Sequence, residues 1–214
     1  GTVILRGTNT YSGTTTVSAG TLNIGGSGSL GSGTYAGNIS NSGTFTYASS
    51  TAQTLSGVIS GSGELTKSGS STLTLSGTNT YSGDTTISAG AITVSGLLGN
   101  GTYAGGIANS GTLTLSSSSA QTLSGVISGS GGITKSGSGN LTLSGNNTTT
   151  GTISLSSGNL IAGSDNALGS APTISASNTP TLKTSDGVTL PSLEVTGDII
   201  SVSYTHLTLP TNDQ

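Results

Sequence analysis

The chain has 214 residues and a formal net charge of −3, and only 5% of its residues are charged and 3% aromatic. With four basic residues and no cysteine, it cannot form a basic nucleic-acid-binding patch, a disulfide or a thiolate metal site. We therefore expect no nucleic-acid partner. Its apolar residues are regularly spaced and β-forming, which argues against disorder.

Short segments in which polar and apolar residues alternate follow one another along the chain. In order they are TTTV (14–17), TLNI (21–24), GTFTYA (43–48), QTLSGVIS (53–60), ELTKS (64–68), STLTLSG (71–77), TTIS (85–88), AITVS (91–95), GTLTLS (111–116), QTLSGVIS (121–128) and GITKS (132–136). A period of two is typical of strands, and Gly, Ser and Asn corners separate the segments. We predict short strands throughout and no substantial helix.

The sequence also repeats itself. Residues 49–69, SSTAQTLSGVISGSGELTKSG, return as SSSAQTLSGVISGSGGITKSG at 117–137, so that Lys67 and Lys135 correspond. Repetition with Gly-rich corners predicts a β-solenoid, whereas a hairpin sandwich would show Asn-Gly or Asp-Gly turns between paired strands. With rungs of roughly 20–25 residues, one repeat step corresponds to about three rungs, so identical side chains are expected to stack.

A second repeated element is the turn GTNTYSG, which occurs at 7–13 and again at 77–83, so that Tyr11 and Tyr81 correspond. The third copy reads GNNTTTG at 145–151. We expect the aliphatic residues of the flanking strands to form the core. These residues are Leu5, Val17, Leu22 and Ile24 in the first copy, Leu73, Leu75, Ile87, Ile92 and Val94 in the second, and Leu141, Leu143, Leu155 and Leu160 in the third.

The segment LTKSGSSTLTLSGTNTYSGDTTISAGAITV at 65–94 resembles the autotransporter-associated β-strand repeat. Its elements occur in that family's order: Leu-Thr-Lys-x-Gly, a Leu-Thr-Leu-x-Gly strand, an Asn-x-Tyr-x-Gly turn, a Thr-rich strand and an Ala-Gly corner. Residues 133–162 and about 3–24 resemble parts of the same pattern. The motif positions, to which we assign a structural role, are Leu73, Leu75, Gly77, Asn79, Tyr81, Gly83, Ile87, Gly90 and Ile92.

This resemblance implies an all-β, right-handed parallel β-helix in the passenger of a Gram-negative autotransporter. Such a passenger is secreted to the bacterial cell surface by type V secretion and held at the outer membrane by a C-terminal translocator barrel. The implied role is a structural or adhesive stalk that supports adhesion, aggregation or biofilm formation. The implied partners are glycans or proteins of host or bacterial surfaces, or a second copy of the chain.

The C-terminal residues differ in character from the rest. VSYTHLTLPT at 202–211 resembles a translated sequencing adapter and contains the chain's one histidine, His206. We therefore predict a β-helical passenger fragment at 1–201 and a non-native tail at 202–214. With that histidine set aside, the abundant Ser and Thr hydroxyls lack a general base.

No residue pattern indicates an enzyme, a cofactor or a metal site, and we expect none of the three. The carboxylates Asp186, Glu194 and Asp198 could share one face, where a solvated rim, a cation site and a catalytic pair are the alternatives. Repeated tyrosines, Tyr11 with Tyr81 and Tyr35 with Tyr103, fit either a ladder capping the core or a sugar-stacking surface. Two other functions stay open: a polysaccharide-acting β-helix enzyme, and a threonine array that binds carbohydrate or ice.

Overall fold

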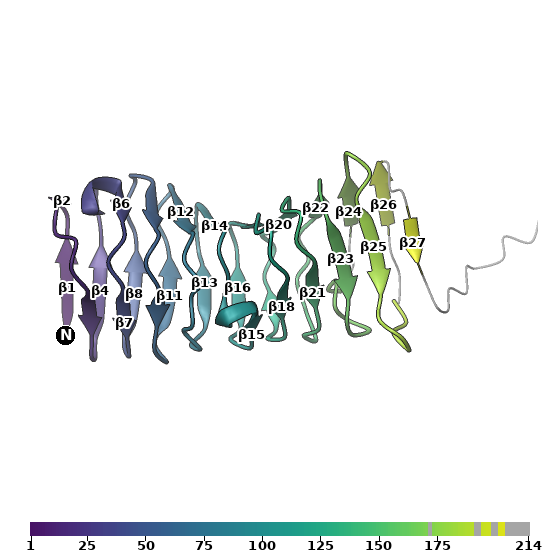
Figure 1. The fold of residues 1–214 in the computed structure, drawn as a ribbon, viewed down its shortest axis with the longest axis horizontal. Helices are drawn as coiled ribbons and strands as arrows, with labels where there is room; N and C mark the ends of the chain where they lie inside the picture. The colour runs from purple at the N-terminus through teal and green to yellow at the C-terminus, as the bar shows by residue number, and fades with distance from the viewer. Residues whose placement is uncertain (171–172, 191–193, 198–200, 204–214) are drawn as a thin grey trace, which may run out of the picture.

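A computed structural model describes residues 1–170, 173–190, 194–197 and 201–203. Parallel strands coil along one axis, and the first strands lie at one end of an elongated stack (Figure 1). Every strand pair in the described part is parallel, and no helix there is long and apolar enough to cross a membrane. The predicted all-β parallel β-helix is confirmed, with about nine turns.

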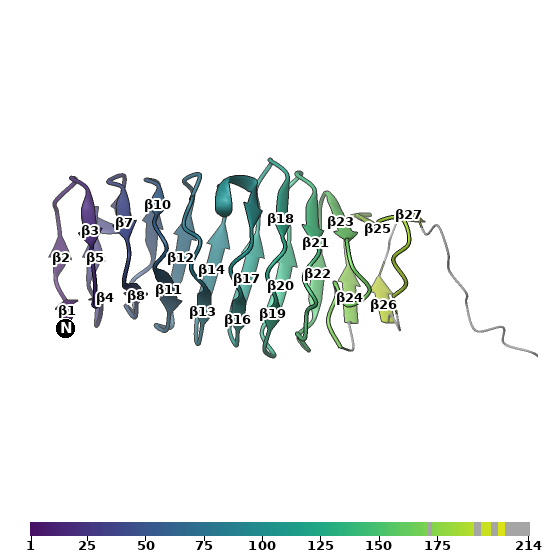
Figure 2. The ribbon, with the colours of Figure 1, turned by 90° about the horizontal axis from the view of Figure 1, so that it is seen from below.

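Successive strands along the chain visit three faces in turn, which Figures 1 and 2 show from two sides. Face 1 consists of β1 (Thr2–Leu5), β4 (Thr21–Ile24), β8 (Thr44–Tyr47), β11 (Glu64–Lys67), β13 (Thr85–Ile87), β16 (Ile107–Asn109) and β19 (Ile127–Ser128). Face 2 consists of β6 (Thr34–Tyr35), β9 (Gln53–Leu55), β12 (Thr72–Leu75), β14 (Ala91–Val94), β17 (Thr112–Leu115), β20 (Gly132–Lys135), β22 (Ile153–Leu155), β24 (Thr173–Ala176) and β26 (Glu194–Gly197). The pair β2 (Thr8–Asn9) and β5 (Ser29–Leu30) leads into face 2, where the Leu30 N–H donates to the Gln53 side chain.

Face 3 contains two sheets. They are formed by β3 (Thr15–Val17), β7 (Ile39–Asn41) and β10 (Ile59–Ser60), and by β15 (Thr102–Tyr103), β18 (Gln121–Leu123), β21 (Leu141–Leu143), β23 (Asn159–Ala162), β25 (Thr181–Thr184) and β27 (Ser201–Ser203). Between them the chain bridges through Thr78 and Leu97. Two three-residue 3₁₀ segments, η1 (Gly31–Gly33) and η2 (Gly99–Gly101), precede β6 and β15.

The sequence repeat and the structural rung have different lengths. On face 2, Leu73 pairs with Ile92, Ile92 pairs with Leu113 and Leu113 pairs with Ile133, so three rungs lead from Leu73 to Ile133. One repeat step instead leads from Leu73 to Leu141, in the next strand along the chain. A repeat step is therefore three rungs plus about one face. The matching strands β1, β12 and β21 accordingly lie on faces 1, 2 and 3.

This offset corrects the expectation that repeat-equivalent side chains stack on one another. Each column of stacked residues instead combines different repeat positions, as in the pairing of Leu75 with Val94 on face 2. The two 3₁₀ segments show the same rotation, because in Figure 1 the first lies beside β6 at the top and the second beside β15 at the bottom. Successive repeats therefore present the same motif on successive faces.

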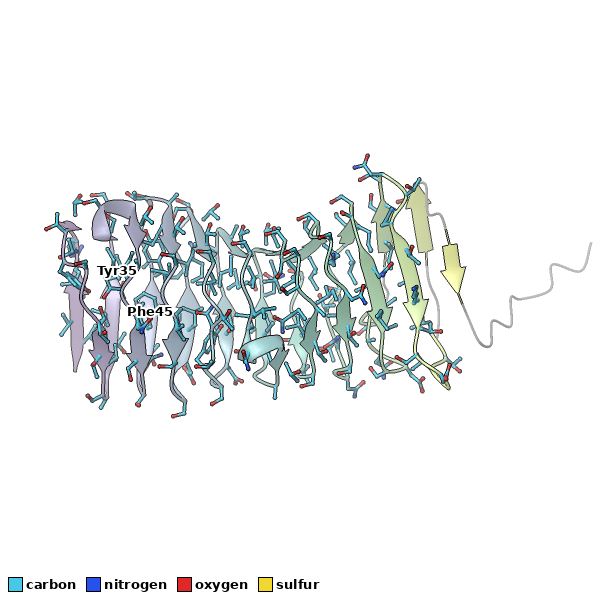
Figure 3. The ribbon with its side chains drawn as sticks, viewed as in Figure 1. Tyr35 and Phe45 are labelled. Atoms are coloured by element: carbon cyan, nitrogen blue, oxygen red, sulfur yellow. The ribbon has the colours of Figure 1, made fainter. Side chains whose placement is uncertain are left out.

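The core runs along the axis between the three faces. Figure 3 shows Tyr35 and Phe45 inside the coil, and both side chains are fully buried. Twelve of the thirteen aliphatic residues expected in the core are buried. Leu5 is the exception: it is partly buried, because its strand β1 is covered by a neighbouring rung, β4, on one side alone.

The boundary predicted at residue 201 falls within β27, which pairs with β25. Residues 204–214, including His206, lie outside the described residues. The domain boundary and the adapter-derived tail therefore stay predictions.

Candidate functional site

The nine predicted motif residues come together around one turn, residues 77–83, and the strands on either side of it. The side chains of Leu73, Leu75, Asn79, Tyr81, Ile87 and Ile92 are all at most 1% exposed. Gly77 is buried, and Gly83 and Gly90 are partly buried. The structure thus places the motif inside the solenoid, and the structural role assigned to it stays a prediction.

Asn79 joins three successive rungs from inside the turn. Its Oδ1 accepts a hydrogen bond from the Ile59 N–H at 2.9 Å, and its Nδ2 donates to the carbonyls of Gly77 at 3.0 Å and Leu97 at 3.1 Å. Ile59 lies one rung before Asn79 and Leu97 one rung after it. The amide therefore replaces main-chain partners where the strand ladder of face 3 is interrupted.

The corresponding residue of the third copy, Asn147, makes the same kind of bridge. Its Oδ1 accepts from the Ile127 N–H and its Nδ2 donates to the Ala167 carbonyl, both at 2.6 Å. This bridge lies on face 1, one face on from that of Asn79. The asparagine side chain of this turn therefore bridges neighbouring rungs in both copies, although the two copies lie on different faces of the solenoid.

Tyr81 and Tyr103 form a buried pair joined by a hydroxyl. Their ring centroids are 5.3 Å apart, and Thr85 Oγ1 lies 2.8 Å from each phenolic oxygen. The Tyr103 O–H donates to the carbonyl of Gly83. Because the Gly83 carbonyl can only accept, the direction of donation is fixed along the chain of hydroxyls. The Tyr81 O–H donates to Thr85, and the Thr85 O–H donates to Tyr103.

The tyrosine pair favours the core ladder over a sugar-stacking surface in the second copy. Tyr81 and Tyr103 are 1% exposed and therefore present no ring face to a ligand. In the first copy Tyr11 and Tyr35 stack edge to face at 5.4 Å, and Tyr11 is 39% exposed in the first rung.

Two lysines of the repeat are buried, which the sequence pattern did not indicate. Lys67 and Lys135 are 0% and 2% exposed. The Lys67 ammonium donates to the carbonyls of Gly69 and, at 3.5 Å, Ala89, and lies 5.9 Å from the ring centre of Tyr47. Burial lowers the pKa of both lysines. Main-chain carbonyls thus take the place of a carboxylate partner.

Other polar side chains also support the interior. The Gln53 side chain accepts a hydrogen bond from the Leu30 N–H at 2.8 Å and donates one to the Leu30 carbonyl at 3.0 Å. The Gln121 side chain makes the same two hydrogen bonds with Leu98, at the same distances. Both glutamines stand beside the 3₁₀ segments and replace strand pairing there. Their recurrence at one repeat step was the sequence signal that could have identified them.

The carboxylates form no candidate metal site in the part of the chain that the structure describes. Asp186 is exposed, and Asp198 lies outside the described residues. No cluster of three or more His, Asp or Glu side chains occurs among the described residues. Asp84 is exposed and accepts a hydrogen bond from the Gly106 N–H at 2.7 Å, which is a loop contact between rungs.

Comparison with protein families identifies the repeat. A family model described as passenger-associated-transport-repeat matches residues 1–24, 65–94 and 133–162. Three segments of the chain are thus similar to this repeat, and together they make up less than half of its length. This match confirms the resemblance to autotransporter passenger repeats. Comparisons with curated proteins and with solved structures gave no significant match.

The matched segments contain several of the buried polar residues as well as part of the apolar core. The second match contains Lys67, Asn79 and Tyr81, and the third contains Lys135 and Asn147. Each of these residues bonds to a neighbouring rung or turn. These contacts fasten each rung of the stack to its neighbours.

Alkaline pH is expected to destabilise the fold through the buried tyrosines. Burial raises the pKa of Tyr81 well above 10.0 and that of Tyr103 to about 12. The folded state then holds these protons more tightly than the unfolded state, so stability falls as pH rises from about 10 towards 12. Tyr103 alone costs up to about 3 kcal/mol. The lowered lysine pKa values act oppositely, raising stability as pH climbs towards the ordinary lysine value of 10.5.

Thermal unfolding followed by circular dichroism from pH 8 to pH 12 tests this expectation. The unfolding temperature should be highest near pH 10 and fall steeply above it. The Tyr103→Phe variant should lose less stability over the same interval than the parent chain. An unfolding temperature that stays constant to pH 12 would contradict the assignment.

Proposed function

We propose that this chain is a non-catalytic, rigid stalk segment of an autotransporter passenger that supports adhesion, aggregation or biofilm formation at the bacterial surface. The observation that carries the proposal is the unbroken sheet of nine parallel strands on face 2, built across repeat boundaries. Because each rung is bonded to the next, bending the stack requires many contacts to break together. Such a stack would hold the parts of the passenger attached to it at a distance from the cell surface.

The partners follow from this role. In the intact protein a C-terminal translocator would anchor the passenger in the outer membrane. The sparsely charged, Ser- and Thr-rich surface would meet glycans or proteins of host or bacterial surfaces, or a second passenger. Many weak contacts along the stalk would then add up to firm attachment.

Surface display tests the proposal. The chain would be inserted between a signal sequence and a translocator barrel in a non-clumping bacterium, and settling and attachment to abiotic and epithelial surfaces measured. Increased attachment relative to a translocator without the insert is expected, with no turnover of bacterial or plant polysaccharides by the purified chain. Unchanged attachment would reject the adhesive role, and release of sugar fragments would reject the non-catalytic one.

A specific observation favours a second candidate, binding to an ordered carbohydrate or ice surface. Outward hydroxyls stack in register on every strand of face 2. This hydroxyl column consists of Thr34, Thr54, Thr74, Thr93, Thr114, Thr134, Ser154, Ser175 and Thr196. At about 4.8 Å per rung it is roughly 38 Å long.

The column on face 2 is not a simple product of the repeat. Thr74 corresponds to Ile4 on face 1, and Thr93 corresponds to Ile161 on face 3. Both non-hydroxyl residues thus lie outside face 2. Faces 1 and 3 have interrupted columns, broken by Ala108 on face 1 and by Ile161 on face 3.

Matched variants separate this candidate from the stalk. Thr114→Lys on face 2 and Thr46→Lys on face 1 are repeat-equivalent substitutions of partly buried threonines. Sedimentation with microcrystalline cellulose or chitin, and thermal hysteresis for ice, would be measured for both. Retention that Thr114→Lys reduces and Thr46→Lys does not would support the second candidate, whereas the absence of retention and of hysteresis in the parent chain would reject it.

A further inference from the structure

A surface hollow of about 230 Å³ lies on face 1, where β13, β16 and β19 run side by side in the middle of the stack (Figure 2). The exposed Asp84 lines it from the first of these rungs, and Val126, which is 45% exposed, lines it from the last. Gly106 and Ala108, in the rung between them, fill little space. The hollow therefore lies between a carboxylate and an apolar side chain.

The first copy of the repeat has a side chain in the corresponding place. There β7 pairs with β10 as β16 pairs with β19, and Asn38 stands where Gly106 stands. The Asn38 Oδ1 accepts a hydrogen bond from the Val58 N–H at 2.9 Å, and Val58 is partly buried, whereas its counterpart Val126 is exposed. The loss of this asparagine in the second copy thus uncovers the valine.

The differences between the two copies change the chemistry of the hollow. Five of the eight lining residues are the same in both copies: Thr85, Thr86, Ile107, Val126 and Ser128. The other three replace Thr14, Asn38 and Ser40 by Asp84, Gly106 and Ala108. An amide and a hydroxyl are thereby removed, and a carboxylate is gained.

Two polar groups of the hollow have hydrogen-bonding capacity that the protein does not use. The Val126 N–H, whose counterpart on Val58 donates to Asn38, makes no hydrogen bond within the part of the chain that the structure describes. The Asp84 Oδ1 accepts the Gly106 N–H at 2.7 Å, which holds the carboxylate in place, and its Oδ2 receives no donor there. A ligand would find a donor, a charged acceptor and an apolar contact close together.

We propose that this hollow binds one sugar ring of a glycan. A sugar has adjacent hydroxyls that would donate to the Asp84 carboxylate, oxygens that would accept from the Val126 N–H, and C–H groups that would pack on the Val126 side chain. Pockets for drug-sized ligands measure about 300–1,000 Å³, so that this smaller hollow suits a single ring. The site would supply a glycan contact for the attachment role proposed above, and to that extent it rests on that role.

Titration of the isotope-labelled full chain with free sugars, followed by the amide signals in NMR spectra, tests the proposal. The probes are D-glucose, D-galactose, D-mannose and N-acetyl-D-glucosamine. At least one of them is expected to shift the Val126 and Gly106 amide signals saturably, with a Kd on the order of millimolar because the ligand is small. The absence of saturable shifts with all four sugars, or shifts confined to the hydroxyl column of face 2, would overturn the proposal.

Gly106→Asn restores the arrangement of the first copy and should abolish binding. The new amide would occupy the hollow and accept from the Val126 N–H, as Asn38 does from Val58. An added Cβ at Gly106 would come no closer than 3.4 Å to the Asp84 carboxylate, so the fold is expected to hold, and an unfolding temperature at or above that of the parent chain would show it. Binding with the affinity of the parent chain would overturn the proposal.

Asp84→Asn should weaken binding by roughly tenfold, because it removes the charged acceptor. Asp165→Asn is the matched control: Asp165 is also exposed and also accepts an N–H from a neighbouring rung, that of Thr189 at 2.8 Å. This control should bind sugar as the parent chain does. Equal weakening by the two substitutions would show that net charge, and not the hollow, is responsible, and would overturn the proposal.

The sugar titration and the surface-display assay can fail separately. Saturable shifts without increased attachment would support the sugar site and reject the adhesive role. Increased attachment without such shifts would support the adhesive role and overturn the sugar site.

Discussion

Replacing Asn79 with alanine is expected to lower the free energy of unfolding by about 3 kcal/mol. The Asn79 side chain is fully buried and accepts a hydrogen bond from the Ile59 N–H. Ile59 lies in β10, the last strand of its sheet, so no strand of the next rung provides a main-chain acceptor for this N–H. Alanine would leave this donor without its acceptor in a site closed to water, whereas the carbonyl of Gly77 would keep the Leu97 N–H as a donor. Denaturant unfolding of the variant and the parent chain, followed by circular dichroism, gives the difference.

Asn9 is the matched control for this prediction, because it is the same motif position in the first rung. Its Nδ2 donates to the carbonyls of Gly7 and Ser29 at 2.8 and 3.1 Å, but its side chain is only partly buried. Water can replace it there, so Asn9→Ala should cost below about 1 kcal/mol. If the two variants lose the same stability, the bridge between rungs does not explain the Asn79 effect.

The alternation of polar and apolar residues was sufficient to predict the strands and most of the core. In STLTLSG, Leu73 and Leu75 point inward and Thr74 points outward, as a period of two requires. This succeeds because the direction of a strand side chain depends on its neighbours in sequence. Leu5 departs from the rule because its exposure depends on a rung that lies over it, which alternation does not encode.

The rotation of the repeats could not be read from the pattern. A repeat step gives the distance in sequence between equivalent residues, whereas the length of a rung depends on how much chain each corner uses. Corners differ: the stretch from Leu22 to its partner Phe45 contains η1 and is longer than the stretch from Phe45 to its partner Leu65. Only the pairing register shows that one repeat step exceeds three rungs.

Buried polar residues were the main omission at the candidate site. Lysine is mostly exposed in proteins, so the sequence did not indicate a buried Lys67, whereas Asn79 was assigned a structural role from the motif without its contacts. What holds them inside is a set of main-chain groups from adjacent rungs, and these meet only after coiling. In the third copy both members of the tyrosine–threonine hydrogen bond change together: Thr149 replaces Tyr81, and Ile153 replaces its partner Thr85.

Gly90→Ala is expected to be at least as damaging, lowering the free energy of unfolding by about 3 kcal/mol or more. The residue has a φ of +69°, which disfavours any side chain. An added Cβ would lie 2.4 Å from the carbonyl oxygens of Gly69 and Ser71, and 2.8 Å from the Lys67 ammonium nitrogen. The corner glycine and the buried lysine of the preceding rung therefore depend on each other.

Gly132→Ala isolates this effect from the general consequence of replacing a glycine. Gly132 lies in β20, and an added Cβ would meet nothing closer than the Thr152 carbonyl at 3.8 Å. Alanine there should be neutral or stabilising by up to about 1 kcal/mol, because it restricts the unfolded chain. Lys67→Ala should then recover part of the loss in the Gly90→Ala chain, as measured by a double-mutant cycle. Strict additivity of the two substitutions would show that lysine and glycine act separately and that backbone strain alone accounts for the corner.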